Sequence, residues 1–175
     1  MTRRAVFFDR DGTLMEDVAY CADPALVRLY PGVADALAGL KQAGFLLILI
    51  TNQSGIGRGL MTEQQYHAVH AEFHRQTGGI LDAAYYCADA PGVPSTRRKP
   101  EPGMVFEAAR DFHVDLASSY FVGDKAIDVE CGRRAGTRTI QVLTGRGVEQ
   151  PAGADEIAAD AVEAVGIILG KPRRL

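Results

Sequence analysis

Short apolar runs without polar interruptions constrain the fold of this chain more than any other feature. Ala5–Phe8 and Phe45–Ile50 are the clearest of these runs, and Tyr120–Val122 has the same character. A strand with one face in water alternates apolar and polar side chains, whereas a strand covered on both faces does not. The runs therefore predict buried strands in a mostly parallel sheet.

Amphipathic stretches separate the apolar runs and predict helices between the strands. These helices are expected at about residues 31–44, 62–77, 101–113 and 161–169, with a further one around Asp128. Additional strands are expected at about residues 81–87 and 137–143, with a short edge strand at 157–159. Gly55–Gly59 is expected to be a flexible loop. Strands that alternate with helices predict an α/β fold, a doubly wound three-layer sandwich.

The composition fits one globular domain over residues 1–175. Of these 175 residues, 47% are hydrophobic, which is enough for a substantial core. The segment 15–29 is too short for a separate cap domain. A formal net charge of −3 argues against general nucleic-acid binding, which needs a basic surface. Since no signal peptide or membrane span is found, we expect a cytoplasmic monomer with neither a nucleic acid nor a membrane as partner.

Two aspartates follow the first predicted strand directly. Asp9 and Asp11 flank Arg10 and precede Gly12. One interpretation is an ordinary turn, in which the aspartates cap the backbone and the glycine takes a positive φ. Carboxylates at the end of a buried strand, however, have little water around them and need a metal, basic partners or hydrogen bonds. This strand end is therefore a candidate site.

Other segments bring polar groups to the same edge of the predicted sheet. Thr51 and Asn52 follow the second strand, Asp124 and Lys125 follow the fourth, and Lys99 begins a helix. In a doubly wound sheet, functional groups gather at the carboxyl ends of the strands. A turn explanation would have to hold separately for each segment, whereas one shared site accounts for them together.

The chemistry available to this set is limited to a few reactions. Asp9, Asp11 and Asp124 offer the hard oxygen ligands that suit Mg²⁺. Lys99 and the hydroxyl of Thr51 can neutralise and hydrogen-bond phosphoryl oxygens. A carboxylate can also act as a nucleophile and form an aspartyl-phosphate. The residues therefore favour phosphoryl transfer.

The motifs, in their order along the chain, resemble the haloacid dehalogenase (HAD) superfamily of phosphatases. The residues that carry this resemblance are Asp9-x-Asp11-Gly12-Thr13, Thr51, Lys99 and Gly123-Asp124 with Asp128. Further stretches are similar to the D-glycero-D-manno-heptose 1,7-bisphosphate 7-phosphatases and the related histidinol-phosphatases. These are Phe8–Thr13, Thr51–Ile56, Tyr85–Cys87, Arg98-Lys99-Pro100 and Gly123-Asp124-Lys125.

The resemblance implies a role for each matching residue. Asp9 would be the nucleophile and Asp11 the general acid and base, while Thr51 and Lys99 would bind the transferring phosphoryl group. The metal ligands would be Asp9, Asp11 and Asp124. Substrate contact or support of the site is implied for Asp17, Asn52, Arg98 and Lys125. Asp128 would orient Lys125 or a metal-bound water.

One stretch departs from these subfamilies, which usually carry a zinc loop with a Cys-x-His pair and a later Cys-x-Cys pair. Cys87 keeps the first position, but Asp89 stands in place of the histidine. Ser95 and Arg97 stand in place of the two later cysteines. One thiolate cannot make a structural zinc site, which needs four ligands, so no structural zinc is expected.

A different metal interpretation involves the helix expected at about residues 62–77. His70 and His74 are four residues apart, a spacing that can place both rings on one side of a helix. No carboxylate-rich or cysteine-rich setting accompanies them, and a polar helix face explains them equally well.

The function implied is that of a Mg²⁺-dependent phosphomonoesterase acting on a small phosphorylated sugar, with heptose 1,7-bisphosphate as the leading substrate. Histidinol phosphate or another sugar phosphate is the alternative. A nucleic-acid 3′-phosphatase is more remote because the net charge is acidic. A non-catalytic phosphate-binding module would need a missing catalytic residue, and Asp9, Asp11, Lys99 and Asp124 are all present.

Overall fold

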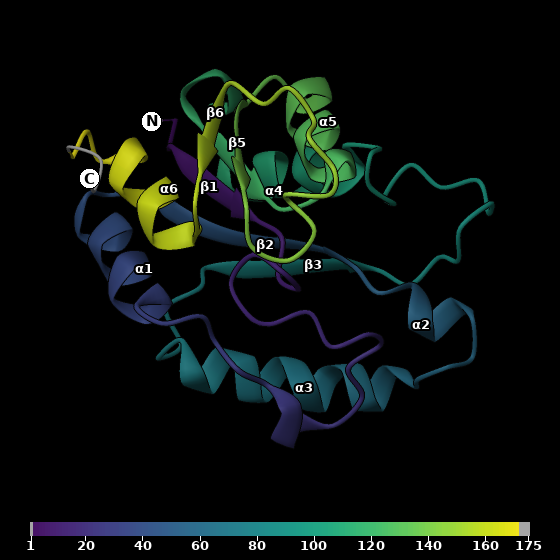
Figure 1. Ribbon diagram of the computed structural model, residues 1–175. Helices are drawn as coiled ribbons and strands as arrows, with labels where there is room; N and C mark the ends of the chain where they lie inside the picture. Colours follow the sequence, from purple (N-terminus) through teal and green to yellow (C-terminus); the bar gives the residue numbers. More distant parts are fainter. Residues whose placement is uncertain (1, 172–175) are drawn as a thin grey trace.

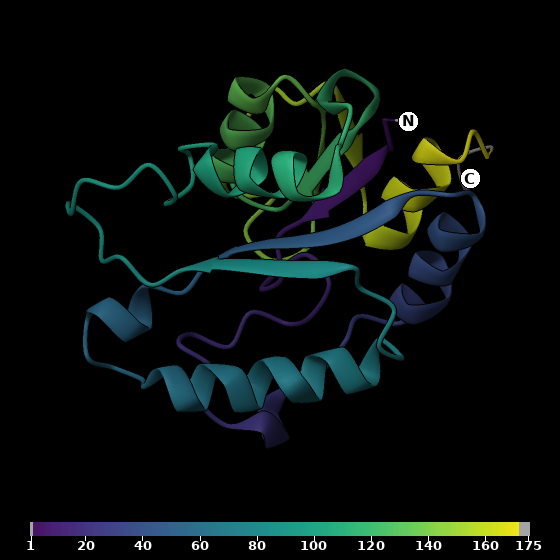
Figure 2. The ribbon, with the colours of Figure 1, turned by 180° about the vertical axis from the view of Figure 1, so that it is seen from behind.

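The computed structural model describes residues 2–171, which form one six-stranded sheet with helices on both faces (Figures 1 and 2). The strands are β1 (Ala5–Phe8), β2 (Leu46–Asn52), β3 (Ala83–Cys87), β4 (Tyr120–Gly123), β5 (Arg138–Val142) and β6 (Glu156–Ala158). They lie in the order β3-β2-β1-β4-β5-β6, and every neighbouring pair is parallel. The predicted doubly wound α/β architecture is confirmed.

The helices divide between the two faces of the sheet. They are α1 (Val33–Gln42), α2 (Ser54–Gly57), α3 (Glu63–Gln76), α4 (Gly103–Phe112), α5 (Ala126–Ala135) and α6 (Ala161–Ile168). Buried residues of α1, α3 and α6 pack on one face, and those of α4 and α5 pack on the other, so the chain forms three layers (Figure 1). No helix within residues 2–171 is both long and apolar enough to cross a membrane.

The first strand shows why its sequence does not alternate. Successive strand residues point to opposite faces. Val6 and Phe8 therefore belong to the core on the α1, α3 and α6 side, while Ala5 and Phe7 belong to the core under α4 and α5. All four side chains are fully buried, so each position must be apolar. The rings of Phe7 and Phe121 stack with their centroids 6.3 Å apart, which ties β1 to β4.

Helix α3 begins with a capping box at Thr62. The Thr62 hydroxyl accepts a hydrogen bond from the Gln65 amide at 3.1 Å, and the Gln65 side chain accepts one from the Thr62 amide at 2.8 Å. This reciprocal pair satisfies two backbone donors that the first turn would otherwise leave open. The helix brings the ring of His70 against Tyr66 and Phe73, at centroid distances of 5.9 Å and 6.2 Å. His70 therefore packs among aromatic rings.

The expectation of a flexible loop at Gly55–Gly59 is wrong for its first half, because Ser54–Gly57 forms the single turn α2. Gly55 is buried, and a Cβ there would come within 2.8 Å of the Tyr20 ring. The Gly57 amide donates to the carbonyl of Ala88 at 3.0 Å. Glycine has low helix propensity, so the turn is stabilised by these tertiary contacts, which the local sequence does not reveal.

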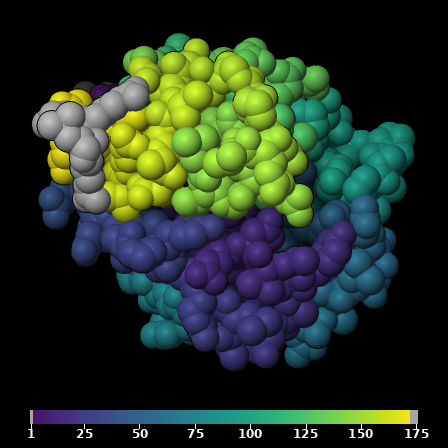
Figure 3. All heavy atoms as spheres, viewed as in Figure 1, coloured from purple at the N-terminus to yellow at the C-terminus, as the bar shows by residue number. Residues whose placement is uncertain are grey.

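The central strands define where a ligand would bind. β1 and β4 are neighbours, and from them the sheet continues to β2 on one side and to β5 on the other. Such a reversal of strand order opens a crevice at the carboxyl ends of the strands. Asp9 follows β1 and Asp124 follows β4, so both lie at this crevice. The segments after β1 and β5 meet in front of it (Figure 3), where the Thr144 hydroxyl donates to the Gly12 carbonyl at 2.7 Å.

Candidate active site

The site is built around the buried carboxylate of Asp9. Its Oδ1 atom lies 2.7 Å from Nζ of Lys99, which also lies 2.7 Å from Oδ1 of Asp128 and donates to the carbonyl of Ile50 at 2.8 Å. The side chain of Lys99 is only 1% exposed. A buried ammonium needs such partners, because no water replaces them. Lys99 thus connects β1, β2 and α5 at one point.

A second ammonium group faces the other oxygen of Asp9. Lys125 Nζ lies 3.8 Å from Asp9 Oδ2 and 3.5 Å from both Asp124 Oδ1 and Asp17 Oδ2. It also donates to the main-chain carbonyl of Asp11 at 3.1 Å. Asp9 therefore lies between two cations, with Oδ1 held by Lys99 and Oδ2 held less closely.

These charges shift the pKa values of the aspartates in opposite directions. Burial by itself would raise the pKa of Asp9, but Lys99 and Lys125 outweigh it and hold the pKa below its ordinary value. Burial, reinforced by the negative charge of Asp9, raises the pKa of Asp124 to about 7. Burial by itself would lower the pKa of Lys99, but the negative charges of Asp128 and Asp9 outweigh it and raise the pKa. At neutral pH, Asp9 is a carboxylate.

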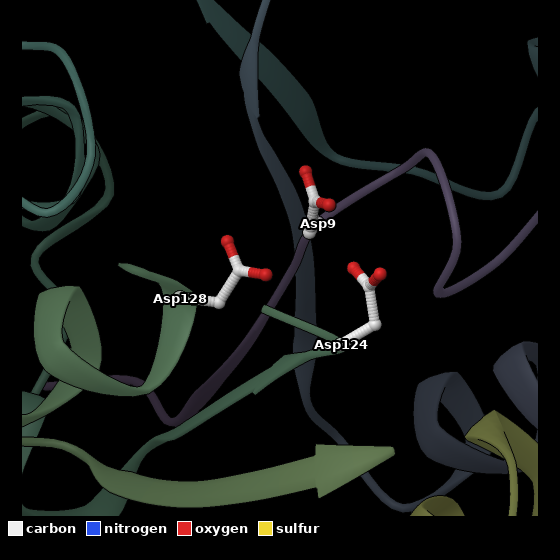
Figure 4. A group of neighbouring side chains, drawn as sticks. All are labelled: Asp9, Asp124 and Asp128. Atoms are coloured by element: carbon white, nitrogen blue, oxygen red, sulfur yellow. The ribbon is translucent and has the colours of Figure 1, made fainter. Parts of the chain in front are cut away.

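Three carboxylates converge in a geometry that suits a metal ion. One oxygen each from Asp9, Asp124 and Asp128 lie within 4.8 Å of one another. Figure 4 shows these three side chains, which come from the ends of β1 and β4 and from α5. Gly12, at a φ of +88°, passes so close that a Cβ there would lie 2.5 Å from Asp124 Oδ2. Hard oxygen donors of this kind fit Mg²⁺. The assignment of Asp9 and Asp124 as metal ligands stays a prediction.

Asp11 directs its carboxylate away from this oxygen group. Both of its carboxylate oxygens accept from the Arg10 guanidinium at 3.1–3.3 Å, and Oδ2 also accepts from Gln53 Nε2 at 2.9 Å. The same Gln53 nitrogen donates to the Thr51 hydroxyl at 2.9 Å. The predicted acid–base residue and the predicted phosphoryl-binding hydroxyl are therefore linked. The main-chain carbonyl of Asp11 accepts from Lys125 Nζ at 3.1 Å, and the role of Asp11 as a metal ligand stays a prediction.

The residues predicted to contact substrate surround a cavity of about 780 Å³ in front of Asp9. They are Asp17, Asn52, Arg98 and Lys125, and Arg146 also lines this cavity. Asn52 also fixes Lys99, because its side chain accepts from the Lys99 amide at 3.0 Å and donates to the Lys99 carbonyl at 3.1 Å. The structure therefore brings together all the site residues predicted from the sequence.

Comparisons with known proteins identify the family of this chain. Residues 96–165 match the HAD-hydrolase-like family. A D-glycero-D-manno-heptose-1,7-bisphosphate 7-phosphatase of Chlorobaculum tepidum is 39% identical over 97% of this chain and 96% of its own length. The chain belongs to the HAD-like phosphatase family.

Further HAD-like relatives resemble the chain over most of its length. A D-glycero-beta-D-manno-heptose-1,7-bisphosphate 7-phosphatase of Escherichia coli is 40% identical, over 90% of this chain and 87% of its own. A crystal structure of D,D-heptose 1,7-bisphosphate phosphatase from B. bronchiseptica, complexed with magnesium and phosphate, has a TM-score of 0.89 and 32% identity. The structural match covers 95% of this chain and 98% of the B. bronchiseptica chain. As a HAD-like family member, this chain is an enzyme, a phosphatase.

Three residues that support this HAD-like site have no role predicted from the sequence, and they are Arg10, Gln53 and Arg146. Arg10 is fully buried, and its guanidinium lies 5.6 Å from the centre of the Tyr66 ring. Gln53 links Asp11 to Thr51, and the Arg146 amide donates to Asp124 Oδ2 at 2.8 Å. Asp128 was expected to orient Lys125 or a water, but it also pairs with Lys99. The signal for Asp128 was its spacing of four from Asp124 at the start of a helix.

Proposed function

We propose that this phosphatase is Mg²⁺-dependent and removes the 7-phosphate of D-glycero-D-manno-heptose 1,7-bisphosphate through an aspartyl-phosphate on Asp9. The observation that carries the proposal is the position of Asp9 between Lys99 and Lys125, with Asp124 beside it at the strand-order reversal. Relatives that span nearly the whole chain carry the heptose bisphosphate name, which supports this substrate.

The first step is attack by Asp9 on the substrate phosphorus. Lys99 holds Oδ1 at 2.7 Å, so the less restrained Oδ2 is the attacking oxygen. A new bond forms between Oδ2 and phosphorus, and the bond from phosphorus to the sugar oxygen breaks. Asp11 gives its proton to the leaving alkoxide. Lys99 and the Thr51 hydroxyl stabilise the charge on the transferring phosphoryl group.

The second step regenerates Asp9. Asp11 takes a proton from water, whose oxygen attacks the phosphorus of the aspartyl-phosphate. The phosphorus–Oδ2 bond then breaks and inorganic phosphate leaves. Asp9, Asp11 and Asp124 would hold Mg²⁺, which would supply positive charge for the transferring phosphoryl group.

The proposal extends to the setting in which the enzyme works. It acts on a small molecule rather than a nucleic acid, as a cytoplasmic monomer, and without structural zinc. The net charge of −3 supports the first point. Cys87 is the one thiol in the stretch where zinc ligands are expected, which supports the last point.

A panel of phosphomonoesters tests the substrate assignment. Phosphate release is measured from heptose 1,7-bisphosphate, histidinol phosphate and several hexose phosphates, first with Mg²⁺ and then with EDTA. We expect the highest kcat/KM for the heptose and loss of turnover in EDTA. A higher kcat/KM for histidinol phosphate would make that compound the assigned substrate in place of heptose 1,7-bisphosphate. Undiminished turnover by the Asp9→Asn variant would contradict the assignment of Asp9 as the nucleophile.

A further inference from the structure

The connection from β3 to α4 projects from the sheet and ends at the active site. Figures 1 and 2 show this teal segment extending beyond the end of β3 before it returns. It carries Arg98, which lines the cavity, immediately before Lys99. Lys99 is fixed by Asn52 and by its buried ion pairs, whereas Arg98 must be held by the segment itself.

The hydroxyl of Ser95 is the centre of the contacts that close this segment. It accepts hydrogen bonds from the backbone amides of Arg97 at 3.2 Å and Arg98 at 3.1 Å. On its other side it lies 3.7 Å from Sγ of Cys87, the last residue of β3. Cys87 is buried, and its Sγ also donates to Asp89 Oδ2 at 3.3 Å. Ser95 therefore joins the rigid end of a strand to the backbone of Arg98.

The guanidinium of Arg98 is attached to the outgoing limb of the same segment. Its Nη1 donates to the Asp89 carbonyl at 2.9 Å. A guanidinium has five N–H donors in a fixed plane. Holding one edge through Nη1 leaves the other edge able to bind an anionic group in the cavity.

We propose that Ser95 is a positioning residue that holds Arg98 in place to bind a second anionic group of the substrate, remote from the phosphate that Asp9 attacks. This inference rests on the proposed function, because it requires a substrate with two anionic groups. Ser95 touches neither Asp9 nor the phosphate under attack. Its effect therefore falls on the affinity for a doubly charged substrate, and the chemical step is spared.

A double-mutant cycle measures whether Ser95 acts through Arg98. Ser95→Ala, Arg98→Ala and the double variant are assayed with heptose 1,7-bisphosphate and with p-nitrophenyl phosphate, which has no second anionic group. We expect Ser95→Ala to raise KM for the bisphosphate about fivefold, in line with the loss of one or two hydrogen bonds. On the Arg98→Ala background it should raise KM no further, and the kcat of Ser95→Ala for p-nitrophenyl phosphate should stay at the wild-type value.

Matched variants separate the hydroxyl from the packing of the side chain. Ser95→Thr keeps the hydroxyl acceptor and should retain the wild-type KM. Ser95→Val has the shape of threonine but lacks the hydroxyl, so its KM should match that of Ser95→Ala. Ser118→Ala is the control. The Ser118 hydroxyl donates a hydrogen bond to the nearby carboxylate of Asp115 at 2.7 Å. A KM rise that is equal in the Arg98→Ala background, or a kcat loss on both substrates, would overturn the inference.

Amide hydrogen exchange tests the same contact without any substrate. In Ser95→Ala the amides of Arg97 and Arg98 should exchange at least about fivefold faster, since each loses its acceptor, while amides of α4 keep their rates. Unchanged exchange at both amides would overturn the positioning role. If the wild type hydrolyses p-nitrophenyl phosphate but not the heptose bisphosphate, the substrate proposal fails, and the exchange rates still decide the role of Ser95.

Discussion

Lys99 and Asp9 form an ion pair of 2.7 Å in which the two side chains are only 1% and 6% exposed. The same ammonium pairs with the fully buried Asp128, so one cation balances two carboxylates. Removing one partner of a buried pair leaves a charge with neither water nor a counter-ion. Lys99 therefore contributes both to the stability of the fold and to the state of the nucleophile.

Replacing Lys99 with methionine should impair folding and catalysis together. We expect the free energy of unfolding in urea to fall by about 3–5 kcal/mol, because Asp9 and Asp128 lose their shared cation. Phosphate release should fall by about 10²–10³ or more, since a charge-stabilising donor is lost. Lys41→Met is the control. Its ion pair with Asp82 is partly exposed, so it should cost about 1 kcal/mol or less and leave turnover unchanged. Wild-type stability in Lys99→Met would contradict the role of this pair.

Substitution of Asp124 with asparagine should weaken the binding of Mg²⁺. The variant keeps the shape of the side chain but removes a charged ligand from the carboxylate group. We expect the Mg²⁺ concentration for half-maximal phosphate release to rise about tenfold or more, and calorimetry to show weaker Mg²⁺ binding. The exposed Asp35 of α1 supplies a control, since Asp35→Asn should change neither quantity. Equal Mg²⁺ affinity in Asp124→Asn and the wild type would contradict the assignment of Asp124 as a metal ligand.

The site residues that the sequence predicts are those that lie at the carboxyl ends of strands. Asp9 and Asp124 directly follow apolar runs, and parallel strands bring their carboxyl ends to one edge. Knowing the α/β pattern is then enough to place both residues in the crevice. Asp128 is predictable to the same degree, because it lies in the first turn of the helix that follows Asp124.

The parts that could not be predicted depend on contacts between distant segments. Arginine is seldom fully buried, and Arg10 between two aspartates would ordinarily lie in water. Its burial requires α3 to place Tyr66 over the guanidinium. The turn of α2 likewise depends on the contact between Gly57 and Ala88, which local helix propensity does not encode.

Gly123 is required by the approach of Asp128 to the end of β4. A Cβ at position 123 would lie 2.3 Å from Cβ of Asp128, closer than real Cβ contacts allow. We expect Gly123→Ala to lower the free energy of unfolding by about 1–3 kcal/mol, and to lower kcat because Asp128 is displaced from Lys99. Gly166 lies within α6, and apart from its own helix backbone a Cβ there would meet no atom of residues 2–171 within 4 Å. Gly166→Ala should therefore stabilise the fold by about 0.5–1 kcal/mol. Denaturant unfolding of both variants checks the contrast, which equal destabilisation would contradict.

His70 should make the stability of the fold depend on pH. Burial, together with the positive charges of Arg10, His74 and His67, lowers its pKa to about 4. The unfolded chain binds a proton at this residue below about pH 6.5, whereas the folded protein does so only near pH 4, so protonation favours unfolding between these values. Because the ring is partly exposed, we expect a loss of about 1 kcal/mol on going from pH 7 to pH 5. The loss should disappear in His70→Gln and persist in His67→Gln, whose ring is exposed on the same helix. Urea unfolding of the three proteins at both pH values measures this difference, and an equal loss in His70→Gln and the wild type would assign the pH dependence to other groups.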